Sequence, residues 1–337
     1  MDDKTRIFDL HCDTLDRLGW PLLDEDLKGV QKAYVDEDSD MVEPGVLIDF
    51  ASGHGHLSLD RTAAFDWCQC LAIYVPDPYT PAQSARFFET IVATLPRHIV
   101  AHPDMLAQVR DARDIESVLA RGCTAGLLTI ENGKLLAAAP DMVERIAVSG
   151  VKMVTLTWNA ENPLGSGNET THGLSAFGRE MIAALEARRI VVDVSHLNDA
   201  GFADLLGCAK RPFAASHSNS RAICPHPRNL TDDQFRALRD AGGIAGINYC
   251  RRFLSDEHDD PTREDLLAHI EHWLDLDGSD AIALGSDYDG CDVPSWLAPC
   301  DRMGELAELL RTHFGPELAE KILFSNAHEF FMRNETL

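Results

Sequence analysis

The sequence predicts an α/β fold, a (β/α)8 TIM barrel, and three observations lead to this prediction. Short apolar runs rich in β-branched residues alternate with longer amphipathic stretches, and eight such runs can be counted. Runs that are apolar on both faces are typical of parallel strands covered by helices. The chain has 337 residues, of which 45% are hydrophobic, and its composition shows no break. We therefore expect one domain over residues 1–337; an open doubly wound sheet is the alternative.

The eight expected strands are short, and each is separated from the next by room for at least one helix. Their apolar character on both faces is what a parallel sheet covered by helices requires. In chain order they span residues 6–10, 70–75, 126–130, 152–157, 190–195, 212–216, 243–248 and 280–286.

Between these runs, apolar residues recur at a spacing of three to four, as on one face of an α-helix. The clearest helical segments are SARFFETIVATLPRHI, PDMVERIAVSG, FGREMIAALEARR, DDQFRALRDAG and REDLLAHIEHWLDL. One of them also carries end signals: Thr231 precedes DDQF as an N-cap with acidic residues in the first turn, and Gly242 and Gly243 end the helix. These boundaries support the alternation of strands and helices.

Two stretches interrupt the alternation. Residues 20–55 are acidic and weakly periodic, and we expect a small N-terminal excursion beside the first strand, in the form of a β-hairpin over the barrel mouth. Residues 159–173, NAENPLGSGNETTHG, are polar and rich in glycine. They predict a long loop after the fourth strand, on the side of such barrels where substrate loops lie.

The charge balance excludes some classes of partner. The chain has 55 acidic and 30 basic side chains, a formal net charge of -25, which would repel nucleic-acid phosphates and anionic lipid headgroups. The first residues lack a signal-peptide pattern, and no stretch reaches the roughly 18 apolar residues of a membrane span. The nine cysteines form no CxxC pair and are expected to be reduced and mostly buried. These features predict a cytoplasmic protein.

Ionisable residues stand at, or just after, the C-terminal ends of five expected strands. His11 and Asp13 follow the first strand, and the alternation of side chains along a strand puts both on the same face. The residues that follow the third, fifth, sixth and eighth strands are Glu131, His196, His217 and Asp287. Because these strand ends form one face of a β/α barrel, we expect the six side chains to converge.

Each of these residues has a structural interpretation when it is taken alone. An HxD pair arises often by chance, Glu131 could cap a strand, a histidine after an apolar run is often a core residue, and Asp287 could form a turn. Together, however, they would crowd carboxylates and imidazoles into one barrel mouth without compensation for desolvation and repulsion. A divalent cation removes this conflict.

The ligand types and their number suggest which metal is bound. Nitrogen and oxygen ligands without thiolates suit zinc, with manganese, cobalt or iron as alternatives. Three histidines and three carboxylates exceed the needs of one four-coordinate site, which predicts two ions about 3.5–4 Å apart that share a carboxylate.

The other histidines are weaker candidates. The HxH pair of His54 and His56 fits a solvated loop, His172 and His226 could support the site or contact substrate, and the rest, His98 and His102 among them, look like surface or helix residues.

The set of motifs resembles the membrane dipeptidase (renal dipeptidase) family of zinc peptidases, a branch of the metal-dependent amidohydrolase barrels. The resemblance extends from about residue 6 to residue 333. It is carried, in this order, by FDLHCDT, TIENG, VTLTWNAENPLGSG, VDVSHLN, ASHSNSRAI, HPRNLTDDQ, GGIAGIN and ALGSDYDG. Each segment is short, and the specificity lies in the ordered set.

The resemblance implies a role for each matched residue. One zinc ion would be held by His11 and Asp13, the second by His196 and His217, and both would be bridged by Glu131. Asp287 matches the catalytic aspartate of the family. Arg228, in HPRNL, matches an arginine that binds the substrate carboxylate, a task suited to a planar bidentate donor; a loop salt bridge is its structural alternative.

Trp158, Asn159 and Tyr249 complete the expected substrate contacts, and two of them depart from the family pattern. Trp158 stands where the well-studied animal enzymes carry a histidine assigned to substrate and transition state, so the residue that performs that task here is open. A tyrosine that holds the substrate carboxylate in those enzymes aligns with Cys250 rather than with Tyr249.

The activity that the resemblance implies is that of a two-zinc dipeptidase. It would hydrolyse L-Xaa-L-Xaa and L-Xaa-D-Xaa dipeptides through a hydroxide shared by the metals, with Asp287 as the proton acceptor; the resemblance also favours a homodimer. Two alternatives stand beside it. One is a hydrolase of the same barrel that acts on N-acyl amino acids or lactones. The other is a metal-binding or interaction protein without catalysis, although Asp287, a carboxylate beyond the ligands, argues against this.

Overall fold

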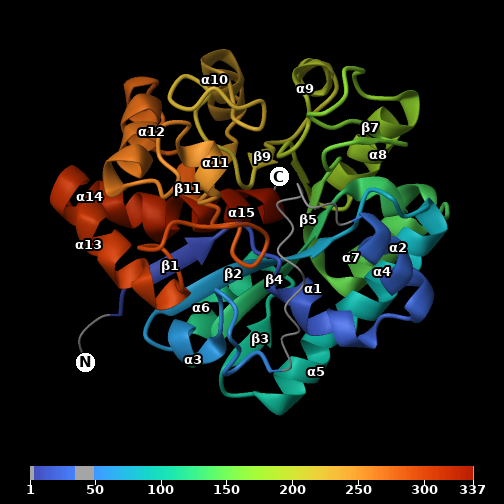
Figure 1. The fold of residues 1–337 in the computed structure, drawn as a ribbon, viewed down its shortest axis with the longest axis horizontal. Coiled ribbons are helices and arrows are strands. Elements are labelled where there is room, and N and C mark those ends of the chain that lie inside the picture. Colours follow the sequence, from blue (N-terminus) through green and yellow to red (C-terminus); the bar gives the residue numbers. More distant parts are fainter. Residues whose placement is uncertain (1–3, 35–48, 337) are drawn as a thin grey trace.

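The computed structural model describes residues 4–34 and 49–336, and its centre is a closed barrel of parallel strands (Figure 1). Each strand is hydrogen-bonded to the strand that precedes it and the one that follows it around the ring. In order around the barrel the strands are β1 (Arg6–Asp9), β2 (Asp66–Tyr74), β4 (Thr124–Glu131), β5 (Val151–Thr155), β8 (Val191–Asp193), β9 (Ala214–Ala215), β10 (Ile244–Ile247) and β11 (Ile282–Leu284).

Closure of the ring rules out the open sheet. The last strand, β11, pairs in parallel with the first, with Leu284 opposite Asp9. All eight expected strands are confirmed, in the expected order. A further short strand, β3 (Leu106–Gln108), pairs with the first residues of β4 outside the ring sequence. At three residues it is too short to show a periodicity, and the sequence did not predict it.

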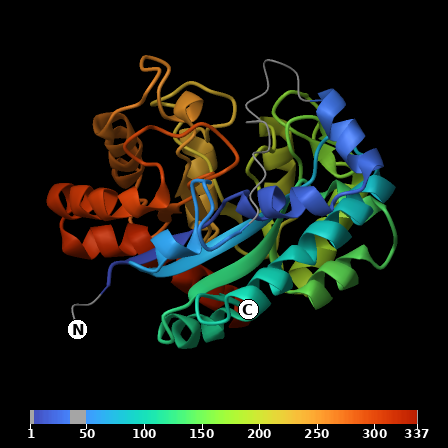
Figure 2. The ribbon, with the colours of Figure 1, turned by 60° about the horizontal axis from the view of Figure 1, so that its bottom comes forward.

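Helices surround the barrel, and Figures 1 and 2 show α12, α13 and α14 on one side of it and α2, α4 and α7 on the other. They are α1 (Thr14–Gly19), α2 (Glu25–Tyr34), α3 (Leu59–Thr62), α4 (Pro81–Val92), α5 (Thr94–Ala101), α6 (Ile115–Leu119), α7 (Met142–Ser149), α8 (Ala176–Ala187), α9 (Asp199–Leu206), α10 (Asp232–Asp240), α11 (Arg251–Leu254), α12 (Arg263–Asp275), α13 (Met303–Phe314), α14 (Pro316–Glu320) and α15 (Asn326–Thr336). None of these described helices combines the length and the apolar character that crossing a bilayer requires.

The predicted ends of α10 are confirmed. Thr231 accepts a hydrogen bond from the backbone N–H of Gln234, whose side chain in turn accepts from the N–H of Thr231. This capping box satisfies two of the free N–H groups of the first turn. At the other end the chain leaves the helix through Gly242, which has a φ of 74°, a conformation that glycine adopts at little cost.

The apolar side chains of the barrel strands belong to two hydrophobic clusters, one inside the barrel and one between the barrel and the helices. Side chains such as Phe8 and Leu127 belong to an inner cluster, while their neighbours Ile7 and Leu128 belong to the cluster that includes the surrounding helices. The inner cluster continues into α15, where Phe331 stacks on Phe8 with ring centroids 5.5 Å apart. The C-terminal helix therefore closes the barrel at the end where the strands begin, and the other end is free for polar side chains.

The excursion after β1 differs from the expectation. Residues Trp20–Leu22 form a 3-10 helix and Glu25–Tyr34 form α2, so the expected hairpin is wrong here; residues 35–48 lie outside the described part of the chain. Leu27 of α2 is buried, and so is Leu23, which lies between the two helices in extended backbone. Residues 159–173 form the expected loop with a two-stranded hairpin inside it, β6 (Glu161–Asn162) and β7 (Gly165–Ser166).

Candidate metal centre

The carboxyl ends of the barrel strands bring the six ionisable residues into one buried cluster. Glu131 is the last residue of β4, and the other five follow their strands by a few residues, so the barrel sets their positions. Their side chains are almost removed from solvent, with exposed fractions between 1% and 8% of the residue surface. The cluster consists of His11, Asp13, Glu131, His196, His217 and Asp287.

Glu131 lies between His11 on one side and the pair of His196 and His217 on the other. Its Oε2 is 3.4 Å from His11 Nε2, and its Oε1 is 2.7 Å from His196 Nε2 and 3.6 Å from His217 Nε2. One carboxylate oxygen thus faces each group. This is the arrangement that a carboxylate shared by two cations requires.

The ligand atoms of the cluster lie at chelating distances from one another. His11 Nε2 is 3.6 Å from Asp13 Oδ2 and 3.9 Å from Asp287 Oδ1. On the other side of Glu131, the Nε2 atoms of His196 and His217 are 3.0 Å apart. Two triplets have ligand atoms within 4.8 Å of one another, and His11 belongs to both.

Hydrogen bonds assign the tautomers of two histidines. His196 Nδ1 is 2.8 Å from Asn159 Oδ1, an acceptor, so Nδ1 carries the proton. His217 Nδ1 is 2.7 Å from Ser216 Oγ, and that hydroxyl donates to Asp193 Oδ2 at 2.6 Å, so it accepts from Nδ1. Both Nε2 atoms are then unprotonated and ready to bind a metal.

Burial makes the charges of the centre costly without a cation. It raises the pKa of Glu131 to about 7 and holds the pKa values of His196 and His217 well below the usual range. Burial also lowers the pKa of His11, but the carboxylates of Asp13 and Glu131 outweigh it and leave that pKa well above its ordinary value. The centre therefore favours a positive charge beside His11.

Two buried atoms of the centre have no hydrogen-bond partner among the described residues, and a metal ion could take that place. They are His11 Nε2 and Asp13 Oδ1. Buried polar atoms without partners are rare and costly. These two atoms, together with the two carboxylate oxygens of Glu131, offer nitrogen and oxygen lone pairs. Divalent cations of the zinc type prefer such ligands.

Left-handed backbone conformations aim several of these side chains. His196, Asp287 and Asn132, the residue after Glu131, have φ values of 68°, 60° and 72°. Such conformations are uncommon for residues other than glycine and concentrate at functional sites. Gly290 allows the close approach of the two acids: a Cβ at this position would lie 1.9 Å from Asp13 Oδ2 and 2.5 Å from Asp287 Oδ1.

Two aspartates that the sequence analysis passed over hold the centre from below. Asp193, at the end of β8, accepts from Ser216 N at 2.8 Å as well as from its hydroxyl. Asp9, at the end of β1, accepts in the same way from the N–H and hydroxyl of Ser286. Each serine precedes a residue of the centre on the neighbouring strand. The sequence does contain a sign of this role: each aspartate stands inside an apolar run, and a carboxylate buried there requires hydrogen-bond donors.

Asn248 is a further residue that the sequence analysis did not single out. It follows β10, and its Nδ2 donates to Asp287 Oδ2 at 3.1 Å and to the carbonyl of His217 at 3.2 Å. The amide therefore ties the catalytic candidate to the histidine side of the centre. Its segment, GGIAGIN, is one of those that carry the family resemblance.

Of the residues expected to contact substrate, Arg228 and Trp158 lie beside the metal centre and Tyr249 does not. Arg228 is 5% exposed, its Nη2 donates to the carbonyl of His217, and its Nε has no partner within the described residues. The half-buried ring of Trp158 lies 5.9 Å from that of His196. Tyr249 does not reach the centre: it is fully buried and its hydroxyl contacts Met303, because Asn248 takes the inward direction and the next side chain points away.

The weaker histidine candidates stay outside the cluster. His56 is not a solvated loop residue: it is half-buried, and its Nδ1 accepts from the N–H of Asp289 at 3.0 Å. His172 is exposed and pairs with Glu161 at 2.7 Å. The ring of His226 packs on Phe253, not on the metal ligands.

Comparisons with known proteins agree with this geometry. The family model for membrane dipeptidases, peptidase family M19, matches residues 3–336. The chain belongs to the membrane dipeptidase family. As an M19 member it is a metallopeptidase of the dipeptidase class, which favours an enzyme over the non-catalytic alternative.

The relatives of this M19 dipeptidase include solved structures. The crystal structure of dipeptidase AC, a metallopeptidase of family M19, is 26% identical, with a TM-score of 0.85 over 98% of this chain and 99% of that one. A metallopeptidase from Rhodobacter sphaeroides, liganded with a phosphinate mimic of the dipeptide L-Ala-D-Ala, is 25% identical, with a TM-score of 0.84 over 98% and 100%.

Curated sequences match over shorter stretches. An uncharacterized protein in the pqqA 5' region of Klebsiella pneumoniae is 36% identical over 190 residues, 53% of this chain and 70% of that one. Two further curated relatives are matched over 55% and 47% of their own length.

Proposed function

We propose that this M19 member is a two-zinc dipeptidase that hydrolyses L-Xaa-L-Xaa and L-Xaa-D-Xaa dipeptides with one catalytic domain, residues 1–337. The observation that carries the proposal is Glu131, with His11 at one carboxylate oxygen and His196 and His217 at the other. The phosphinate mimic of L-Ala-D-Ala bound to the Rhodobacter relative supports tolerance of a D-residue at the C-terminal position.

The residues on each side of Glu131 form two ligand sets that share this carboxylate. His11 and Asp13 complete the first set, and His196 and His217 complete the second. When bound, the zinc ions would supply a water acidified to a pKa of about 7 and would polarise the scissile carbonyl. The protein supplies fixed tautomers and buried carboxylates, so that little reorganisation accompanies binding.

Asp287 performs the proton transfers in this proposal. Burial raises the pKa of its carboxyl group, mainly against the effect of His11, and a more basic carboxylate accepts a proton more readily. The hydrogen bond from Asn248 leaves Oδ1 facing the ligand cluster, 3.9 Å from His11 Nε2. Asp287 takes the proton of the attacking water and delivers it to the amine that leaves.

Arg228 binds the free carboxylate of the substrate. Its guanidinium is buried, has an Nε without a partner within the described residues, and is held over Phe253 at 5.3 Å. A buried cation with a free donor is suited to a carboxylate, which accepts two parallel hydrogen bonds. The half-buried Trp158 offers an apolar wall beside His196 in place of a polar group.

A substrate panel tests the proposed function. Zinc-loaded protein should hydrolyse L-Ala-L-Ala and L-Ala-D-Ala, and should be much slower on L-Ala-L-Ala amide, an N-acetyl amino acid and a lactone. Arg228→Met should raise KM for the free acids about 10–100-fold, the value of one charged hydrogen bond, and leave the amide unchanged. Arg236→Met, at a half-buried arginine on α10, is the control. Absence of any dipeptide turnover would refute the proposal.

Ser216→Ala tests the support of the second ligand set. The change removes the acceptor of His217 Nδ1 and one donor to Asp193. Loss of such a support weakens metal affinity by about 10–100-fold, so activity should fall at limiting zinc and return at high zinc. Ser84→Ala removes a buried hydroxyl from α4 and should leave the zinc dependence unchanged. An unaltered zinc titration of Ser216→Ala would contradict the role of the serine.

A further inference from the structure

A second group of metal-ligand side chains lies outside the barrel mouth, on α5. His98 and the C-cap residue His102 are four residues apart, so they project from the same side of the helix. Asp49, from the segment that leads into α3, meets them there. The ligand atoms of the three residues lie within 4.8 Å of one another.

Neighbouring groups hold these side chains in place. His102 Nε2 is 2.8 Å from Asp49 Oδ1. The carboxylate of Asp49 also accepts from the N–H of Ala51 at 3.1 Å and from the hydroxyl of Ser52 at 2.9 Å. The ring of His98 packs edge-on against Phe50, with centroids 6.0 Å apart. A ligand set that is already oriented loses little conformational freedom when it binds an ion.

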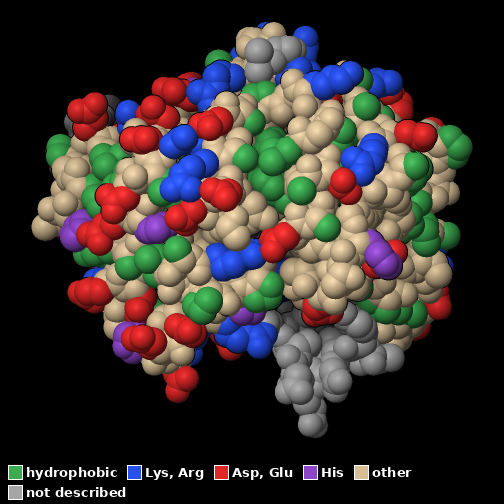
Figure 3. All heavy atoms as spheres, turned by 90° about the horizontal axis from the view of Figure 1, so that it is seen from above, with side chains coloured by type: hydrophobic (Ala, Val, Ile, Leu, Met, Phe, Trp, Pro, Cys, Tyr) green, Lys and Arg blue, Asp and Glu red, His purple; other side chains and the backbone are tan. Residues whose placement is uncertain are grey.

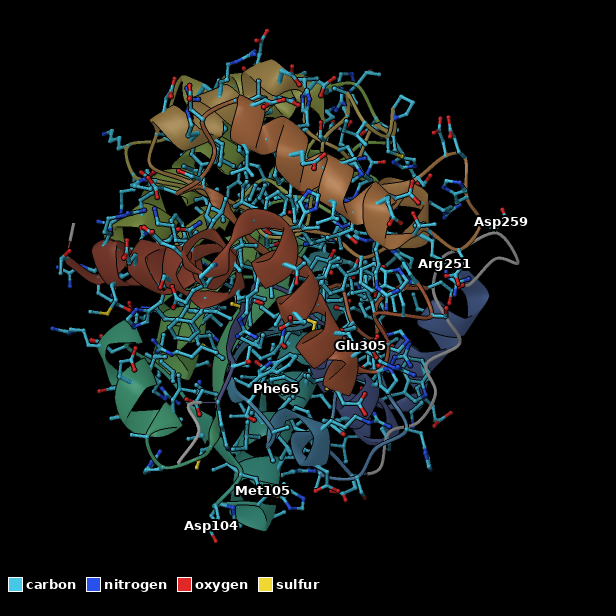
Figure 4. The ribbon with its side chains drawn as sticks, turned by 90° about the vertical axis from the view of Figure 1, so that its left-hand side faces the viewer. Phe65, Asp104, Met105, Arg251, Asp259 and Glu305 are labelled. Atoms are coloured by element: carbon cyan, nitrogen blue, oxygen red, sulfur yellow. The ribbon has the colours of Figure 1, made fainter. Side chains whose placement is uncertain are left out.

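The cluster is also accessible, in contrast to the catalytic centre. All three ligand residues are half-buried, and the side chains of His102 and Asp49 are 22% and 43% exposed. Figure 4 shows Asp104 and Met105, just after His102, at the edge of the molecule. An ion could enter from solvent and keep a water as its fourth ligand.

We propose that Asp49, His98 and His102 bind one zinc ion, separate from the catalytic centre, that fastens the segment 49–57 to α5. Two imidazoles and one carboxylate suit zinc and exclude calcium and magnesium, which prefer oxygen ligands alone. The site shares no residue and no strand end with the barrel mouth.

The fastened segment reaches the edge of the catalytic mouth. At its far end, the backbone N–H of His56 donates to Asp289 Oδ1 at 2.7 Å, and Asp289 follows Asp287 by two residues. Asp289 also accepts from the hydroxyl of Thr14 at 2.5 Å, in the helix after β1. Zinc on α5 thus stabilises a connection that runs from the outer helix to the loop after β11.

Zinc equivalents per chain test the proposal. Equilibrium dialysis of the full-length protein against zinc should give one equivalent less for His98→Ala, His102→Ala and Asp49→Asn than for the unaltered protein, with the same dipeptidase activity. Because the catalytic centre is intact in every sample, the difference counts the second site alone. His258→Ala removes an exposed histidine that also pairs with an aspartate, Asp265 at 2.9 Å. Within the described part of the chain these two residues belong to no group of three metal ligands, so this variant should lose no equivalent.

A stability measurement separates zinc binding from simple ion pairing. Zinc added to protein whose catalytic centre is already filled should raise the melting temperature of the unaltered chain, and Asp49→Asn, which keeps the shape of the side chain, should lose that rise. Equal zinc equivalents in all variants, or an equal rise in melting temperature, would show that Asp49 and His102 form only an ion pair.

Discussion

Asp287→Asn is expected to lower kcat for dipeptide hydrolysis by about 10²–10⁴-fold, the range for loss of a positioned proton acceptor. An amide has the shape of the carboxylate and can still accept the hydrogen bond from Asn248, so the local structure should be preserved. It cannot accept a proton from water. The loss should therefore fall on kcat, with KM nearly unchanged.

Metal content distinguishes this prediction from a loss of ligands. The Asp287→Asn protein should hold as much zinc as the unaltered protein, because the two ligand sets around Glu131 are intact. Asp292→Asn, an exposed aspartate five residues further on, is the control and should keep full activity. Unchanged hydrolysis by Asp287→Asn would mean that another group moves the proton.

Glu131→Gln should lower activity by a similar factor for a different reason, because it removes the group that both ligand sets share. The neutral amide presents an NH₂ group to one set of histidines, where a carboxylate oxygen now lies 3.4 Å from His11 Nε2 or 2.7 Å from His196 Nε2. At least one zinc ion should be lost. A metal ion contributes several kcal/mol to the transition state, and about 4 kcal/mol corresponds to about a 10³-fold loss of rate.

The response to added zinc identifies the cause of that loss. Glu131→Gln should stay inactive in excess zinc, whereas Ser216→Ala, which only weakens a support of His217, should recover. Circular dichroism and melting curves of the variant check that the barrel is folded. A Glu131→Gln protein with full zinc content and near-normal kcat would remove Glu131 from the centre.

The barrel could be predicted from the sequence because its physical signal is local. Each central strand must be apolar on both faces, and this requirement is visible in any short window of the chain. The capping signals of α10 are local as well. The sequence does not predict α2 because the helix is polar, with Leu27 beside the acids Glu25 and Asp26, and the length of residues 20–55 suggests a hairpin instead.

The cluster of ligands was predictable for a different reason. Parallel strands of a barrel end on one face, so residues that follow different strands converge without any knowledge of their contacts. The supports were not predictable in this way, because the role of Asp193 depends on which serine lies opposite it on β9. The contacts of Asn248 and the burial of Tyr249 were not predictable either. They depend on which of these two neighbouring side chains, just after β10, points into the barrel.

Anomalous X-ray diffraction from crystals of the purified protein, at the zinc edge, tests the central claim most directly. We expect two peaks that flank the carboxylate of Glu131, about 3.5–4 Å apart, one beside His11 and Asp13 and the other beside His196 and His217. The same preparation should lose activity with a chelator and regain it with zinc. Side chains without metal density between them, in protein that is fully active when metal-free, would contradict the account.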